Sequence, residues 1–349
     1  MEMSLTDMLP LFTSQIVAKY TDHTKFKSFG RSLFTEVTTV SKLASVISQR
    51  GLKLISSDVE RGQRGTLNVF DKSTQKNILP PYFNEMINLT ELDSYDYLFV
   101  EGVQAEVAWG AFLDDLAKRM EFIMNKIDGA YEKQCWDLLL TGIVTLVNGD
   151  SISYGRKSGS LVDPGAGNYF ANAVDPYGTT FERGATWLNE TGKIQGNTIN
   201  VIFGKTAWKD YLNNASVVAR DLKVNNNLEV LANKAIIDST GKVFKGATTI
   251  GQFNYQFFVY NDWWEDAAQT KTPFLDPKKV VMLPDTLPGV MTYTAVPQRV
   301  RPGQSPTKSK FTVYTAVDEF QDAEYTGVKS AGIPILAGID QVYTEKVVA

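Results

Sequence analysis

The most regular hydrophobic pattern in the chain runs from residue 103 to residue 140. Beyond Val107 the apolar residues are mostly three or four positions apart, which is the spacing of one face of an α-helix. These residues are Val103, Val107, Leu113, Leu116, Met120, Ile123, Ile127, Tyr131, Cys135 and Leu138. The pattern predicts a helix over about 104–140. Such a helix would be roughly 55 Å long, which exceeds the average globular helix several-fold.

Residues 46–92 carry a different pattern, with short apolar runs at 53–56 and 66–70 that are typical of β-strands. Gly62 and Gly65 lie between these runs and suit a bend. The pattern predicts an extended β-hairpin with little apolar content of its own. Because a two-stranded hairpin is at best marginally stable in water, it would need another surface to lie on.

Helical and strand patterns are mixed between residues 176 and 296, which predicts an α/β region with its own core. The predicted helices cover 181–189 and 206–212, with Thr206 as an N-cap, and the predicted strands cover 199–204, 253–260, 280–283 and 290–296. This region is long enough to form a domain.

The remaining segments are less regular. The first 45 residues mix short apolar clusters with polar stretches and predict an N-terminal arm, with a short helix over 8–20. Residues 148–176 are rich in Gly, Ser, Asn and Pro and predict a long loop. Strand-like segments at 311–316 and 341–348 close the chain. The whole pattern predicts an α+β protein.

Composition excludes some classes of function. The chain has 35 basic and 39 acidic residues and a formal net charge of -4. This near balance lacks the concentrated basic charge of a typical nucleic-acid binder. Glu2, Asp7 and Pro10 stand where a signal peptide would have a basic start and an apolar core. The apolar runs are too short to cross a bilayer, so we expect a soluble, intracellular protein without a membrane partner.

Candidate catalytic and metal-binding residues are scarce. His23 is the single histidine and lies in a polar stretch, and Cys135 is the single cysteine, on the apolar face of the predicted helix. Ser-His-Asp and Cys-His catalysis and zinc sites all need histidine or clustered cysteine. One thiol cannot form an internal disulfide. We therefore expect no cofactor, no metal and no catalytic residue, with His23 exposed and Cys135 buried and inert.

One enzymatic alternative stays open, a hydrolase that uses carboxylates of the mixed region. Its candidate residues are Asp210, Asp262 and Glu265. The acidic stretch 262–266 lacks the alternating spacing of a calcium loop, and its two tryptophans suit packing.

Two basic groups lie in predicted loops. Arg61 and Arg64 are at the tip of the predicted hairpin, and the linker or exposed loop over 297–310 holds four more basic side chains. The four are Arg299, Arg301, Lys308 and Lys310. They could be solvated loop charges, or they could form salt bridges with a neighbouring subunit. As inter-subunit contacts we single out Arg61, Arg64, Arg299 and Arg301.

The predicted arm and hairpin cannot bury themselves within one chain. They would be covered if they lay across neighbouring subunits, and head-to-tail contacts of that kind close into rings. Rings linked by arms and hairpins can form shells. The pattern therefore indicates a structural protein that assembles, although other oligomers would also fit.

Three passages resemble one family. The first is 51–55 through 61–65 followed by 78–82, a hairpin with glycine, arginine and a Pro-Pro-Tyr exit. The second is 198–212, a strand–turn–helix, and the third is 330–343, an apolar–Pro–apolar run before the last strand. In this order they are similar to the lambda-type major capsid E family of tailed bacteriophages, which has the Hong Kong 97-like fold.

The resemblance implies a role for each part of the chain. Residues 1–45 would be the N-terminal arm and 46–92 the extended loop that overlaps a neighbouring subunit. Residues 93–176 and 296–349 would form the peripheral domain, with the long helix as its spine. Residues 177–295 would form the axial domain, which meets its copies at the centre of hexamers and pentamers.

The resemblance also implies partners and a location. The shell would be an icosahedral head, assembled in the host cytoplasm, that encloses double-stranded DNA and contacts it without sequence preference. A scaffolding protein, a portal and a decoration protein are the further partners it implies. An encapsulin-like compartment shell of the same fold is the alternative.

Overall fold

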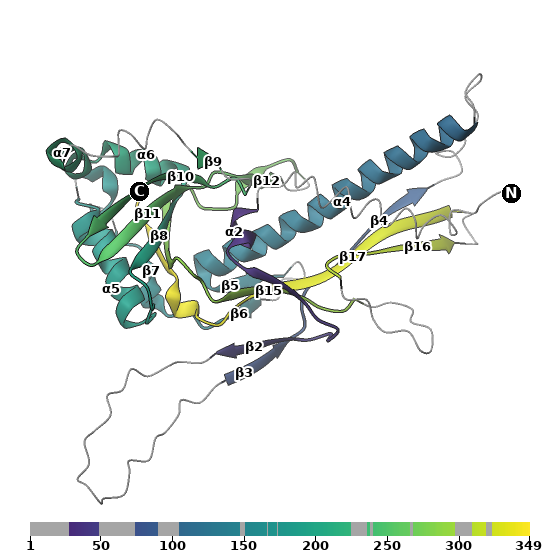
Figure 1. Cartoon of the computed structure of the whole chain (residues 1–349), viewed down its shortest axis with the longest axis horizontal. Helices are drawn as coiled ribbons and strands as arrows, with labels where there is room; N and C mark the ends of the chain where they lie inside the picture. Colours follow the sequence, from purple (N-terminus) through teal and green to yellow (C-terminus); the bar gives the residue numbers. More distant parts are fainter. Residues whose placement is uncertain are drawn as a thin grey trace, which may run out of the picture.

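The computed structural model describes residues 28–48, 74–89, 105–146, 151–165, 167–172, 174–224, 236–237, 240–265, 268–296, 309–318 and 323–349. It is 31% helical and 38% strand, and the described strands form a five-stranded sheet, a seven-stranded sheet and three two-stranded sheets. The predicted α+β class is therefore confirmed (Figure 1).

The long helix is α4 (Ala105–Thr141), with 37 residues, which confirms the helix predicted over 104–140. Its apolar face enters the largest hydrophobic core, where Trp136 and Cys135 are fully buried. The predicted burial of the single thiol is thus confirmed. Gly142 follows the helix at φ +73°, a left-handed conformation that glycine adopts without strain and that commonly ends helices.

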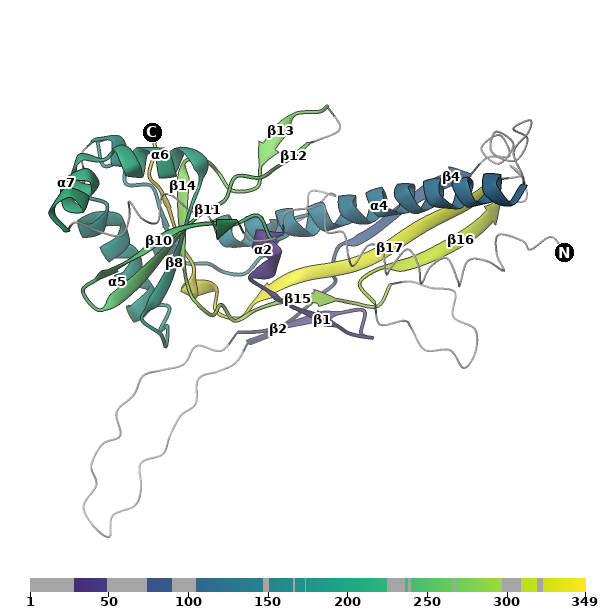
Figure 2. The same ribbon diagram turned by 45° about the horizontal axis from the view of Figure 1, so that its top comes forward.

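A long sheet packs along α4. Its strands are β1 (Thr35–Thr38), β4 (Tyr82–Leu89), β15 (Gly289–Tyr293), β16 (Thr312–Asp318) and β17 (Ala323–Leu336). The first part of β17 pairs with both β4 and β16, and its last part pairs with β15, all antiparallel. In Figures 1 and 2, β4, β16 and β17 run beside α4.

The strand β17 differs from the sequence-based prediction, which placed no strand over 323–336. Gly327, Gly332 and Pro334 break its apolar pattern, and Pro334 lacks the N–H that a central strand would use. In the described part of the sheet Pro334 pairs only with Met291 of β15. A side chain at Gly332 would come within 2.7 Å of the Tyr293 ring, so glycine is what allows this packing.

The second sheet has seven strands in the order β7-β18-β14-β8-β11-β10-β9. Their bounds are β7 (Leu161–Val162), β18 (Tyr343–Lys346), β14 (Lys279–Pro284), β8 (Thr198–Phe203), β11 (Phe253–Val259), β10 (Val243–Ile250) and β9 (Ile236–Ile237). β8 pairs parallel with β11 and antiparallel with β14. The strands predicted at 199–204, 253–260, 280–283 and 341–348 are therefore confirmed.

The seven-stranded sheet lies between two hydrophobic cores. On β8, Ile202 enters the core that contains α4, whereas Val201 and Phe203 enter a second core. β14 alternates in the same way, with Val281 in the first core and Met282 in the second. Because successive side chains of a strand point to opposite faces, strands buried on both faces are largely apolar, as β8 is from Val201 to Phe203.

Three helices border the second core: α5 (Glu182–Glu190), α6 (Lys205–Asn213) and α7 (Ala215–Val224), and α5 follows a π-helical turn at Tyr177–Phe181. The helices predicted at 181–189 and 206–212 are confirmed. The prediction of Thr206 as N-cap is wrong, because α6 begins one residue earlier and Gly204 is its N-cap. A side chain at Gly204 would collide with the backbone of Asp276 and Pro277.

The short elements complete the fold. They are α2 (Phe29–Ser32), β2 (Ala44–Ser48), β3 (Thr74–Ile78), β5 (Ile143–Thr145), β6 (Ser151–Ser153), η1 (Ser158–Ser160), η2 (Phe170–Asn172), β12 (Trp263–Glu265), β13 (Lys271–Pro273) and η4 (Ile339–Gln341). β5 pairs with β6 and β12 pairs with β13. The loop predicted over 148–176 therefore contains short strands and turns.

Candidate assembly surfaces

The segment that precedes β1 is attached to α4 through the carboxylate of Glu132. The backbone N–H groups of Gly30 and Arg31 donate to its two oxygens at 2.7 and 2.9 Å. Trp136 Nε1 and the Tyr260 hydroxyl donate to Oε1 at 2.9 and 3.1 Å. One buried side chain thus joins the N-terminal segment, the long helix and the end of β11.

Burial raises the pKa of Glu132, and its hydrogen bonds oppose that shift. Phe29 lies beside these groups, with its ring centroid 6.0 Å from that of Trp136 and 5.5 Å from that of Tyr260. Part of the segment that the sequence assigns to an arm is therefore packed in the main core.

A second buried carboxylate, Asp128, lies one helical turn before Glu132. Arg31 Nη1 and Lys310 Nζ form ion pairs with its Oδ1, and the Lys310 distance is 2.7 Å. The same two cations approach Glu36 at 3.5 and 3.8 Å, and the Tyr293 hydroxyl donates to Glu36 at 3.0 Å. This cluster connects α4 to the N-terminal segment and to the chain just before β16.

Lys310 corrects one sequence-based interpretation. The sequence placed it in an exposed or linker loop, but its side chain is only 20% exposed and is paired with Asp128. Desolvation lowers the pKa of Lys310, and the Asp128 carboxylate raises it. Lys310 therefore acts as an internal ion-pair partner rather than as a solvated loop charge.

Arg156 connects the C-terminal end of α4 to the second sheet. Its guanidinium donates to the Leu139 carbonyl at 2.5 Å, to the Val342 carbonyl at 3.1 Å and to Thr344 Oγ1 at 2.8 Å. It also donates to the side chain and the carbonyl of Ser160. The planar fork of arginine suits this set of acceptors, which lie on three separate segments.

The strands β2 and β3 form a two-stranded antiparallel ribbon, with Ala44 opposite Ile78. Ala44 and Ile78 pack with Ile333 and Ile335 of β17, so the base of the ribbon is fixed to the long sheet. The ribbon lies at one edge of the described structure (Figures 1 and 2). The strands predicted at 53–56 and 66–70 lie outside the described residues.

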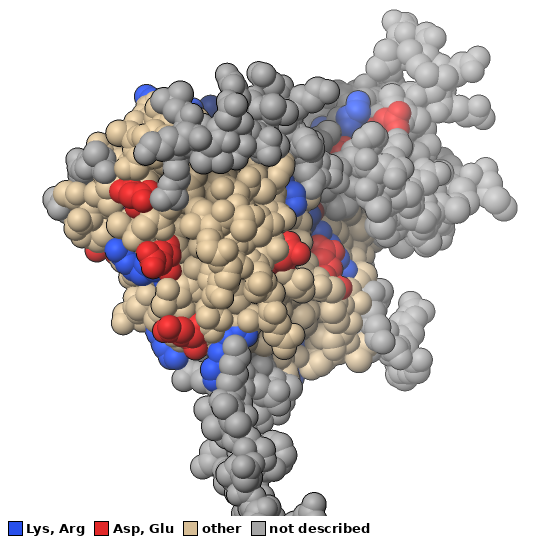
Figure 3. Space-filling model, turned by 60° about the vertical axis from the view of Figure 1, so that its left-hand side comes forward, with Lys and Arg blue, Asp and Glu red and all other residues tan. Residues whose placement is uncertain are grey.

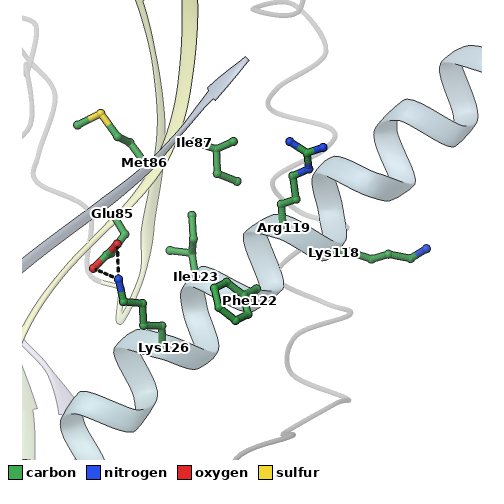
Figure 4. Close-up of a pocket in the computed structure, with 8 residues that line it drawn as sticks. All are labelled: Glu85, Met86, Ile87, Lys118, Arg119, Phe122, Ile123 and Lys126. Carbon is green, nitrogen blue, oxygen red and sulfur yellow. Dashed lines mark hydrogen bonds and ion pairs between the residues drawn. The ribbon is translucent and has the colours of Figure 1, made fainter. Parts of the chain in front are cut away.

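A groove lies between α4 and β4 (Figure 4). It has a volume of about 470 Å³ and its apolar lining is Met86, Ile87, Phe122 and Ile123. Phe122 is 69% exposed and Met86 is 53% exposed. Large apolar side chains that gather on a surface in this way mark sites of contact with another molecule.

Figure 3 shows the end of the molecule that carries the second sheet and its helices. Its acidic and basic side chains lie in small groups in which both signs of charge occur. The described part of this face shows no continuous basic patch. This agrees with the near-balanced charge of the sequence.

The sequence of the chain matches the model of one protein family. The family model described as phage major capsid protein E matches residues 26–346. The chain belongs to the phage major capsid protein E family. Members of this family are structural proteins of the phage capsid, so this capsid protein is a shell component that forms homo-oligomers in the virion.

Solved structures show the same fold. A prophage capsid protein from E. coli CFT073 has a TM-score of 0.66 and 17% identity, with 97% of this chain and 99% of that chain covered. A phage-related protein from Bordetella bronchiseptica RB50 has a TM-score of 0.53 and 10% identity, with 95% and 96% covered. No curated protein matches the chain. The capsid protein has the Hong Kong 97-like fold.

The residues predicted from the sequence as inter-subunit contacts are not among those that the structure describes. Arg61, Arg64, Arg299 and Arg301, the predicted inter-subunit contacts, lie outside the described residues of the capsid protein, and so does His23. Their roles stay predictions.

Two of the three carboxylates offered for a hydrolase lie far apart. Asp210 is on α6, whereas Glu265 is on β12, where it faces Lys271 at 3.9 Å, and these elements are separated in both views of the ribbon. Asp262 precedes β12. The described residues contain no group of three or more His, Cys, Asp or Glu side chains that could hold a metal ion. None of the described helices is both long and apolar enough to span a bilayer.

Sequence reasoning missed Asp128 and Glu132, the two carboxylates that hold the N-terminal segment. A signal was present, because Asp128, Glu132 and Trp136 are each four residues apart and therefore share one helix face. That stripe adjoins the buried positions Tyr131 and Cys135. Charge at such a position indicates a buried, paired group.

Proposed function

We propose that this chain is the major capsid protein of a tailed bacteriophage, which assembles as hexamers and pentamers into an icosahedral head around double-stranded DNA. The family match over residues 26–346 carries this proposal. The β2–β3 ribbon supports it, because the ribbon is fixed at its base and leaves the body of the molecule. Such an extension suits contact with a neighbouring subunit.

The proposal includes the domain roles. Residues 177–295 would form the axial domain at the centre of each capsomer, and residues 93–176 and 296–349 the peripheral domain around α4. Residues 1–45 would form the arm and 46–92 the extended loop. Arg61, Arg64, Arg299 and Arg301 would make ion pairs with neighbouring subunits.

Further partners follow from the same proposal. A scaffolding protein would guide assembly in the host cytoplasm, a portal would occupy one vertex and a decoration protein could cover the outside. Contact with packaged DNA would be non-specific and weak, since a formal net charge of -4 gives little attraction to the phosphate backbone.

The test is expression of the chain, alone and with a scaffolding partner, followed by electron microscopy. We expect closed shells with hexamers and pentamers. Deletion of 58–66 should impair the formation of shells and leave the circular dichroism spectrum and the thermal midpoint of the monomer unchanged. A chain that stays monomeric under all assembly conditions would refute the function, and normal shells after the deletion would refute the role of the extended loop.

A further inference from the structure

A shallow groove runs along the exposed side of α5. Its volume is about 450 Å³, and it lies between α5 and the turns at Gly159 and Gly178. One wall is the half-buried ring of Trp187, which packs so closely on Gly159 that a side chain there would lie 2.6 Å from it. Trp187 Nε1 also donates to the Asp340 carbonyl at 3.0 Å. Tryptophan is enriched among the residues that contribute most to binding at interfaces, so this fixed ring suits contact with another molecule.

The lining of this groove carries a net negative charge. Glu182, Thr186 and Glu190 follow one another at intervals of four residues, so they share the solvent-facing side of α5. Arg183 also lines the groove, but its charge is compensated by Glu345, 3.0 Å away. Neither Glu182 nor Glu190 has a hydrogen bond or an ion pair with another described residue. Basic side chains of an occupant would complement these two glutamates.

The exposed side of α6 has the opposite charge. Lys205, Lys209 and Leu212 lie four and three residues apart, so they form one stripe on this helix, and all three are exposed. Leu212 leaves 44% of its surface open to solvent. Neither lysine has a hydrogen bond or an ion pair with another described residue. Asp210, the carboxylate of α6, lies about 100° around the helix from Lys209, so the stripe itself presents two cations and one apolar side chain.

Within one chain the lysine stripe points away from α5. Tyr211 of α6 faces the core, and its ring centroid lies 5.9 Å from that of Phe181, the residue directly before α5. Tyr211 is two residues beyond Lys209, which places the two side chains about 200° apart, on opposite sides of the helix. The helices α5 and α6 also lie apart in both ribbon views (Figures 1 and 2). The stripe can therefore meet an α5 groove only on another copy.

We propose that the groove beside α5 binds the exposed side of α6 from a second copy of this chain. Leu212 packs on Trp187, and the two lysines of the stripe face the two glutamates of the groove. The inference rests on the proposed shell function, because both helices lie within residues 177–295, the proposed axial domain, and it adds a specific contact to that domain. Since each copy offers one groove and one stripe, the contact is head-to-tail and closes into a ring when the rotation between copies allows it.

Engineered cysteines can detect the contact. The chain that carries both T186C and L212C, treated as assembled particles with a short bismaleimide, should give covalent multimers on a denaturing gel. Each single variant should stay monomeric, and a mixture of the two single variants should give dimers only. The native Cys135 does not compete, because its side chain is fully buried. A monomer linked internally between positions 186 and 212, or intact particles without any crosslink, would overturn the proposal.

Charge reversal gives an independent readout. E182K with E190K should lower the yield of particles about tenfold, because two attractive pairs become repulsive, and K205E with K209E should do the same. The chain with all four reversals should regain the yield of the unmodified chain. K205R with K209R keeps both charges and is the matched control, which should assemble normally. Failure of rescue, with all variants folded by circular dichroism, would contradict the contact.

The outcomes separate this inference from the proposed function. Normal particles of the unmodified chain, together with the absence of multimers from the chain that carries both T186C and L212C, would refute the contact between α5 and α6 and leave the shell function intact. Loss of particles in the E182K, E190K chain that the reversals on α6 do not repair would assign the groove to a different partner, such as a scaffolding protein, and would refute the contact as well. No particles from the unmodified chain would refute the shell function, and the contact that rests on it.

Discussion

At the residue scale, the distinctive feature is a pair of buried carboxylates on the long helix. Glu132 accepts four hydrogen bonds, and Asp128 is paired with two cations. A buried charge is tolerated only when it is paired or fully hydrogen-bonded, and removal of one partner is then costly. These two side chains thus link segments that are about 100 residues or more apart in sequence.

The substitution Glu132→Gln should lower the free energy of unfolding by about 1–3 kcal/mol, because an unsatisfied buried donor costs that much. Glutamine supplies one acceptor oxygen, so its NH₂ group would face a donor, such as the N–H of Arg31. Urea denaturation of the unassembled chain measures the change. Glu190→Gln, at an exposed position of α5, is the matched control and should change stability by less than about 0.5 kcal/mol. Equal effects of the two substitutions would contradict the role of Glu132.

Alkaline pH should destabilise the fold through buried hydroxyl and thiol groups. Burial raises the pKa of Tyr131, Tyr260 and Tyr343, and it raises that of Cys135 well above its usual value. A group whose pKa is higher in the folded state contributes stability below its unfolded pKa and loses it as pH rises. The loss should begin near pH 8.5 with the thiol and steepen above about pH 10, at about 1.4 kcal/mol per pH unit for each group.

Urea denaturation between pH 7 and pH 11 tests this. Tyr131 donates to Ser330 Oγ at 2.5 Å, since the Ser330 hydroxyl itself donates to the Lys310 carbonyl. Tyr131→Phe should therefore lower stability at neutral pH, and it should also reduce the slope above pH 10, so that the two proteins converge toward pH 11. An unchanged slope would show that Tyr131 ionises equally in the folded and unfolded chain.

At the element scale, α4 organises the fold because segments from both ends of the chain pack on it. α2 contacts it from the N-terminal side, and β17 runs along it from the C-terminal side. α2 has only four residues, so its position depends on tertiary contacts and not on its own helical stability.

Gly30 is the residue of α2 that permits this close approach. A side chain there would lie 2.7 Å from Trp136 Nε1 and 3.0 Å from Glu132 Oε1, closer than ordinary contacts. Gly30→Ala should therefore displace the N-terminal segment and speed hydrogen exchange over 28–38, with a cost of about 1–3 kcal/mol. Gly196→Ala, where the added atom would meet only the Thr198 nitrogen at 4.0 Å, is the control. Unchanged exchange in the Gly30 variant would contradict the close fit.

At the scale of the whole molecule, two features are only partly covered by their own chain. The ribbon of β2 and β3 leaves the body, and the groove beside Phe122 keeps a large apolar area open to solvent. On the proposed function, we expect neighbouring copies to cover these surfaces. Contacts at these surfaces would form only when the shell assembles. Substitutions there should therefore change assembly while leaving the folding stability of the single chain unchanged.

The arginines of the extended loop test this separation. Arg61→Ala with Arg64→Ala should reduce the yield of particles at low salt and make that yield less sensitive to added salt, since the ion pairs that it removes are the contacts that salt screens. Sedimentation velocity and electron microscopy measure the yield, and the thermal midpoint of the monomer should not move. Replacement of both residues by lysine keeps the charge and should retain most of the assembly. Full assembly of the alanine variant would exclude these arginines as contacts.

Some parts of this protein were readable from sequence because their pattern is local. The helix over 104–140 and the strands at 199–204 and 280–283 follow from the spacing of apolar residues, which a short window contains. The absence of histidine and cysteine clusters is likewise visible in composition. The Hong Kong 97-like fold was predicted from the three passages that resemble the capsid E family, because the local hydrophobic pattern alone indicates only an α+β protein.

Other parts depend on contacts between distant segments, so only the tertiary structure decided them. β17 is a strand despite Gly332 and Pro334 because β4, β15 and β16 pair with it. Lys310 is in a linker-like sequence, but the Asp128 carboxylate 182 positions earlier holds it inside. The groove beside Phe122 exists only because β4 lies next to α4. The sequence determined the elements with a regular local pattern and the scarcity of histidine and cysteine, and tertiary packing determined which charges are buried, where β17 forms and which apolar surface stays exposed.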